Sequence, residues 1–125
     1  MTLTHLPPLW RFRLLHAIGA RGVRENRRLL AAWSRAEGGS ARWNPLNTTQ
    51  SWPGASLYNA AGVKNYPNPA SGIAATAATL LNGRYDGLVG DLRNGDLAAP
   101  DMVRRNTTEI HTWGTNPLLI LQLLG

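Results

Sequence analysis

The sequence predicts a mainly α-helical single domain with four to five short helices and a long loop or small hairpin region that lines a cleft. Apolar residues recur at helical spacing in several segments that begin and end at capping residues. Between them, at 40–68, this periodicity disappears. The chain has 125 residues, 43% of them hydrophobic, which suits one core. We therefore expect a single domain over 1–125, with a core at about 10–116 and an apolar tail at 117–125.

The first two helices are expected at 10–18 and 24–37. In the second, Leu30, Trp33 and Glu37 recur on one face, while most arginines occupy other faces. Gly38 follows directly and supplies the left-handed backbone with which many helices end. Glu37 is thus predicted at the end of an amphipathic helix, on its inward face.

The loop region at 40–68 is rich in glycine, proline, amides, hydroxyls and aromatic residues. Loops of this length in compact domains are usually either binding loops or disordered segments. Its four aromatic residues argue against disorder. We therefore expect ordered binding loops.

Later helices are predicted by their caps. Asn68 is expected to be the N-cap of a helix that starts at Pro69 and ends before Asn82. Two further helices are predicted at 85–92 and at 100–110. The apolar segment at 118–124 is expected to be either a last packed helix or a strip that a partner covers.

Composition restricts the possible chemistry. The formal charge of +6, nearly all from arginine, favours an anionic partner such as nucleic acid, a membrane surface or a bacterial wall polymer. Because the chain has no cysteine, disulfides and thiol nucleophiles are excluded. His5, His16 and His111 lie far apart, so we expect no metal and no cofactor.

No stretch reaches the roughly 20 apolar residues of a spanning helix, and residues 1–10 lack the pattern of a signal peptide. We expect no stable membrane insertion.

Glu37 is the candidate catalytic residue. Burial beside an indole and a position at the negative end of a helix should both raise the pKa of this carboxyl group. A carboxylic acid that stays protonated near neutral pH can donate its proton to a glycosidic oxygen. The alternative is a glutamate that is solvated or paired with an arginine such as Arg35. Candidate sugar-binding residues follow in the loop: Trp43, Asn44, Asn47, Thr48, Thr49, Gln50, Trp52, Tyr58, Lys64, Asn65 and Tyr66.

Three runs in this order carry a family resemblance: AWSRAEGG at 32–39, WNPLNTTQ at 43–50 and GVKNY at 62–66. Together with TLLNGRY at 79–85 and TWGT at 112–115, they resemble the lysozyme-like module of actinobacteriophage proteins over roughly residues 10–116. A helix that ends in glutamate, then glycine, then Asn-Pro is also similar to soluble lytic transglycosylases and goose-type lysozymes. In those enzymes the glutamate is the general acid, which corresponds to Glu37. The chain has Gly38 where they usually have serine, and it lacks their Gly-Leu-Met-Gln run.

The resemblance implies a glycoside hydrolase or lytic transglycosylase that cuts the β-1,4 bond between N-acetylmuramic acid and N-acetylglucosamine. It implies a bacteriophage-encoded protein that acts on the host cell wall, either as an endolysin released from the host cytoplasm or as a virion tail component. Expected partners are bacterial peptidoglycan and other phage virion or lysis proteins.

Other functions remain as alternatives. The main one is a non-catalytic module that binds the cell wall or builds the virion. A nucleic-acid partner is supported only by the charge and the arginine-rich helix, so none is expected. A serine peptidase is disfavoured because the chain has no Gly-x-Ser-x-Gly elbow.

Overall fold

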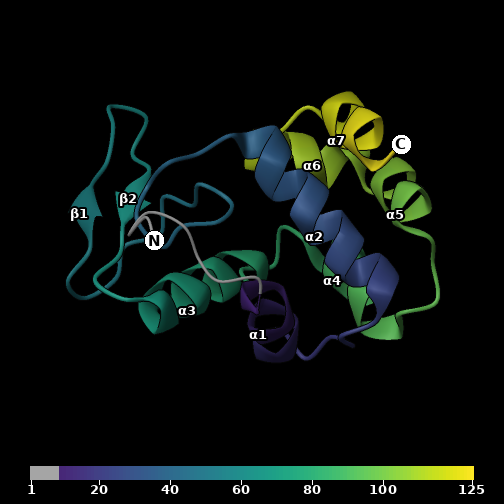
Figure 1. The fold of residues 1–125 in the computed structure, drawn as a ribbon, viewed down its shortest axis with the longest axis horizontal. Helices are drawn as coiled ribbons and strands as arrows, with labels where there is room; N and C mark the ends of the chain where they lie inside the picture. The colour runs from purple at the N-terminus through teal and green to yellow at the C-terminus, as the bar shows by residue number, and fades with distance from the viewer. Residues whose placement is uncertain (1–8) are drawn as a thin grey trace.

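The computed structural model describes residues 9–125, which form seven helices and one two-stranded hairpin (Figure 1). The mainly helical prediction is confirmed, whereas four to five helices was too few. Residues 1–8 lie outside the described residues. They include His5 and most of the segment at 1–10, in which we expect no signal peptide. In residues 9–125 no helix combines the length and apolar character that crossing a membrane requires.

The first three helices lie close to their predicted bounds. They are α1 (Trp10–Ala17), α2 (Arg24–Glu37) and α3 (Pro69–Leu80). Helix α2 ends because Gly38 adopts φ +58°. Helix α3 starts at Pro69 because the Asn68 side chain accepts a hydrogen bond of 2.8 Å from the Ser71 backbone N–H.

The loop region between α2 and α3 contains a small hairpin. Strand β1 (Ser56–Leu57) pairs antiparallel with β2 (Lys64–Asn65), and Gly62 takes φ +92° in the connecting turn. Figure 1 shows the hairpin at one end of the molecule, well away from α5 and α7. This region was predicted to be either a long loop or a small hairpin, and the structure contains the hairpin.

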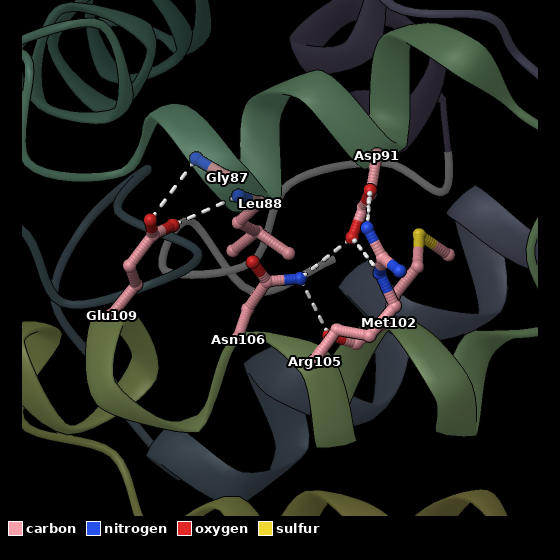
Figure 2. Close-up of polar contacts among 7 residues, drawn as sticks. All are labelled: Gly87, Leu88, Asp91, Met102, Arg105, Asn106 and Glu109. Carbon is pink, nitrogen blue, oxygen red and sulfur yellow. Dashed lines mark hydrogen bonds and ion pairs between the residues drawn. The ribbon is translucent and has the colours of Figure 1, made fainter.

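The prediction of one helix at 100–110 is wrong, because two helices occupy this segment: α5 (Ala99–Arg105) and α6 (Thr107–Trp113). Asn106 between them has non-helical backbone angles, and its side-chain amide donates to Asp91 (2.9 Å) and to the carbonyl of Met102 (2.7 Å). Asp91 belongs to α4 (Asp86–Asn94) and also binds Arg105 (Figure 2). The break therefore depends on a contact with a distant helix.

Glu109 of α6 caps the first turn of α4 from the side. Its two carboxylate oxygens accept the backbone N–H groups of Gly87 (3.0 Å) and Leu88 (2.8 Å), as Figure 2 shows. Free N–H groups at a helix start favour a nearby anion. This pair of bonds ties α4 to α6, and the site described below lies beside both.

The apolar tail forms helix α7 (Pro117–Leu124), which packs against α2, α5 and α6. Ile120 belongs to the same buried cluster as Leu14 of α1, Trp33 of α2 and Leu88 of α4. Of the two alternatives, the packed helix is the one found, and the core extends past the boundary expected at about 116. Leu118 and Leu119 remain exposed on its outer side.

Candidate active site around Glu37

Glu37 is the last residue of α2, and its side chain is partly buried. Trp33, one turn earlier, is fully buried on the same face, as the spacing predicted. The carboxylate oxygen Oε1 accepts a hydrogen bond of 2.9 Å from the hydroxyl of Thr115, which follows α6. The hydroxyl of Thr115 in turn accepts a bond of 2.8 Å from the indole N–H of Trp33.

The pKa of Glu37 lies above its usual value. Burial is the largest effect and raises the pKa, because it disfavours the charged carboxylate. Three neighbouring donors, Thr115 first and then Asn47 and Trp113, lower it by less, because they favour the charged form. Among residues 9–125 no ion pair joins Glu37 to Arg35, and no charged side chain contributes to the raised pKa, so the alternative of a salt bridge to Arg35 is excluded.

The loop that follows α2 is held over the end of the helix. The hydroxyl of Ser34 donates to the carbonyl of Pro45 (2.8 Å), and the indole of Trp113 donates to the carbonyl of Leu46 (2.7 Å). The side-chain amide of Asn47 donates to the backbone carbonyl of Glu37 (3.2 Å). These bonds fix the loop relative to the carboxyl group before any ligand binds.

Gly39 allows this close approach. A Cβ atom at this position would collide with the side-chain amide of Asn47. Asn47 itself adopts φ +58°, a conformation that asparagine tolerates better than most residues. The Gly38-Gly39 pair therefore does more than end the helix, since its second glycine makes room for a residue of the site.

A polar pocket of about 230 Å³ opens beside the carboxyl group. One wall is the loop segment at 47–50. The opposite wall comes from the end of α3, the connection to α4 and the end of α6. Its lining residues are Asn47, Thr48, Thr49, Gln50, Thr79, Asn82, Arg84, Tyr85, Thr112 and Trp113. Glu37 is not among them, but Asn47, whose amide donates to the Glu37 backbone carbonyl, and Trp113 are.

Only part of the predicted sugar-binding set meets at this pocket. Asn47, Thr48, Thr49 and Gln50 line it, and the Thr48 hydroxyl bonds that of Thr79 at 2.6 Å. Trp43, Asn44, Trp52, Tyr58, Lys64, Asn65 and Tyr66 do not line it. The loop region therefore lines this pocket only through residues 47–50, and the other wall comes from α3, α6 and the segment before α4.

Three of these residues hold the loop together instead. Asn44 is buried and its amide donates to the carbonyls of Thr48 (2.9 Å) and Lys64 (2.8 Å). Tyr66 is only 1% exposed, and its hydroxyl donates to the carbonyl of Gln50 (2.7 Å). Asn65 accepts the backbone N–H of Arg42 at 2.8 Å. These contacts hold the loop itself, and none of the three residues lines the pocket.

The residues of the opposite wall and Thr115 were missed as site residues, although the runs at 79–85 and 112–115 contain all of them. In sequence they are a helix end and a short turn, and neither carries a residue with obvious chemistry. The only signal was their presence in the family resemblance.

No second carboxyl group reaches Glu37. Five of the six other acids bind elsewhere: Glu25, Asp91, Asp96 and Asp101 pair with arginines, and Glu109 caps α4. The sixth, Asp86, neither lines the pocket nor affects the pKa of Glu37. Within residues 9–125 no three histidine or acidic residues gather in a way that could hold a metal ion.

A comparison of the chain with protein-family models, with curated proteins and with solved structures finds no match.

Proposed function

We propose that this protein cleaves the glycan strands of bacterial peptidoglycan, with Glu37 as the general acid. The observation that carries the proposal is a partly buried carboxyl group of raised pKa beside a polar pocket. Asn47 and Trp113 connect the two, because they line the pocket and also lower the pKa of the carboxyl group. The setting that fits, by the sequence resemblance, is a bacteriophage protein used as an endolysin or as a virion tail component.

The chemistry needs one acid. Protonated Glu37 donates its proton to the glycosidic oxygen while the bond from that oxygen to the sugar C1 breaks. In one route the substrate's own N-acetyl oxygen attacks C1, and water then attacks C1, displaces the N-acetyl oxygen and gives its proton to the carboxylate of Glu37. In the other route the C6 hydroxyl attacks C1 to form the anhydro end and gives its proton to the same carboxylate. A single-acid route suits this site, because no other carboxyl group influences Glu37.

The pocket suits a polar ligand that carries many hydroxyl and amide groups. Its walls offer the hydroxyls of Thr49 and Thr112 and the side-chain amides of Gln50 and Asn82. Trp113 adds an aromatic surface, which packs edge-on against Tyr85 with ring centroids 5.2 Å apart. Sugar sites combine such polar groups with aromatic rings.

The test is digestion of purified peptidoglycan by the full chain, with the products identified by mass spectrometry. We expect soluble fragments with cut glycan and intact peptides. The mass also distinguishes hydrolysis from transglycosylation, because an anhydro end lacks one water. Products with intact glycan and cut peptides would reject the proposal.

Arg84 is expected to select ligands that carry a carboxylate. Among residues 9–125 it is the one cationic side chain that lines this pocket, it is exposed, and no acidic side chain of this range pairs with it. Replacing Arg84 with Gln should weaken binding of acidic muramyl fragments about tenfold, because a charge-assisted hydrogen bond contributes about 1.5–3 kcal/mol and the site is open to solvent.

The Arg84→Gln measurement is calorimetric titration in the Glu37→Gln background, so that no ligand is consumed. Neutral N-acetylglucosamine oligomers serve as the matched ligand, and their affinity should not change. Arg84→Lys should keep part of the preference. Equal losses for the acidic and the neutral ligand would contradict a charge-reading role.

A non-catalytic glycan-binding module is the second candidate. The observation in its favour is that Glu37 does not line the pocket and already bonds Thr115. Under this alternative the chain sediments with insoluble peptidoglycan but releases no soluble fragment. The same digestion experiment therefore separates the two functions.

A further inference from the structure

We propose that Thr115 is a positioning residue that connects the indole N–H of Trp33 to Oε1 of Glu37 and thereby leaves Oε2 to carry the transferable proton. This inference rests on the proposed function, because it names which oxygen acts as the acid. Thr115 itself is not expected to touch the reacting atoms.

The direction of the hydrogen-bond chain follows from its members. An indole N–H can only donate, so the Thr115 hydroxyl must be the acceptor in the 2.8 Å bond to Trp33. A hydroxyl has a single proton, and the acceptor that it meets is Oε1 of Glu37 at 2.9 Å. Because Oε1 already receives this proton, the carboxyl group's own proton belongs on Oε2.

Burial keeps the chain in this arrangement. Trp33 is fully buried and Thr115 is 4% exposed, so water does not compete for their polar groups. The backbone N–H of Thr115 donates to the carbonyl of Ile110 (3.2 Å), and Gly114 before it takes φ +105°. The end of α6 therefore sets where the hydroxyl lies, and the hydroxyl sets one oxygen of Glu37.

Other charged groups do not explain the state of Glu37. The charged and titratable residues on α2, α4, α6 and the segments that adjoin them include Arg35, Arg42, Arg84, Tyr85, Asp86, Glu109 and His111. None of them is among the causes of its pKa shift. Three neutral donors, Thr115 first, offset the effect of burial.

The test compares Thr115→Val, which keeps the shape but removes the hydroxyl, with Thr115→Ser, which keeps it. Carbon-13 NMR follows the titration of the Glu37 carboxyl group, and proton NMR follows the indole N–H of Trp33. Loss of the donor should raise the pKa of Glu37 by about one unit, because a hydrogen bond to the charged form lowers a pKa. The basic limb of the cleavage rate against pH should shift upward by the same amount, and Thr115→Ser should restore both.

The Trp33 resonance provides a readout that a merely structural threonine would not change. In the wild type it should titrate with the pKa of Glu37, and this response should vanish in Thr115→Val and in Glu37→Gln. An unchanged Glu37 pKa in Thr115→Val, or a Trp33 resonance that ignores Glu37, would overturn the proposal. If Thr115→Val does not fold, the comparison of wild type with Glu37→Gln decides.

These NMR measurements do not require activity. A wild type that releases no glycan fragments would reject the proposed function, whereas the coupling of Trp33 to Glu37 would still be measured. The two failures are therefore distinguishable.

Discussion

Glu37→Gln should lose at least about 100-fold in the release of soluble fragments from purified peptidoglycan. General acids contribute typically about 10²–10⁴-fold to rate, and an amide has no proton of suitable acidity to transfer. The amide oxygen can still accept the hydrogen bond from Thr115, so the local structure should persist. The measurement is dye release from labelled peptidoglycan at several pH values.

The folded state should not suffer from this change. The pKa of Glu37 is raised in the folded protein, so its contribution to stability is fully present below the unfolded pKa and is lost as the pH rises through the folded pKa. A glutamine escapes that loss. In thermal melts, the melting temperature of Glu37→Gln relative to that of the wild type should therefore be higher at about pH 8 than at about pH 5. A lower melting temperature at both pH values would mean that the amide damages the fold.

Asp86→Asn is the matched control for Glu37→Gln. It makes the same carboxylate-to-amide change on an exposed residue that has no ion pair and does not line the pocket. Its fragment release should equal that of the wild type. Undiminished release by Glu37→Gln would remove the residue from the mechanism.

The parts of the fold that follow from local chemistry were predicted from the sequence. Asn68-Pro69 starts α3, and Gly38 in the left-handed region ends α2. The break between α5 and α6 could not be predicted in this way. It depends on the bond from Asn106 to Asp91, fifteen residues earlier on another helix.

The same difference between local contacts and contacts of distant segments applies to the candidate site. Glu37 was identified because its position relative to Trp33 is set by one helix. Its partner Thr115 lies 78 residues away in sequence, and Thr48 meets Thr79 across 31 residues. The loop composition gave the kind of side chain but not its direction, so buried Asn44 and Tyr66 could not be separated from Thr49 and Gln50 at the pocket.

Gly72→Ala should destabilise the protein by about 1–3 kcal/mol and reduce fragment release as well. Gly72 lies in α3, and a Cβ atom there would collide with the backbone carbonyl of Trp43. Overpacking of this kind typically costs about 1–3 kcal/mol. Trp43 adopts φ +50°, a left-handed conformation that bulky residues seldom take. Urea denaturation measures the change in the free energy of unfolding.

Gly90→Ala is the matched control, because it makes the same substitution inside helix α4 where an added Cβ meets no atom within 4 Å. It should stabilise the protein by about 0.5–1 kcal/mol, since alanine is the better helix former. Activity should fall only in Gly72→Ala, because the displaced loop carries Thr48 away from Thr79 and opens the pocket wall. If Gly72→Ala and Gly90→Ala both increase the free energy of unfolding, α3 does not hold the loop through Trp43. The position of the loop would then depend only on its hydrogen bonds at the end of α2.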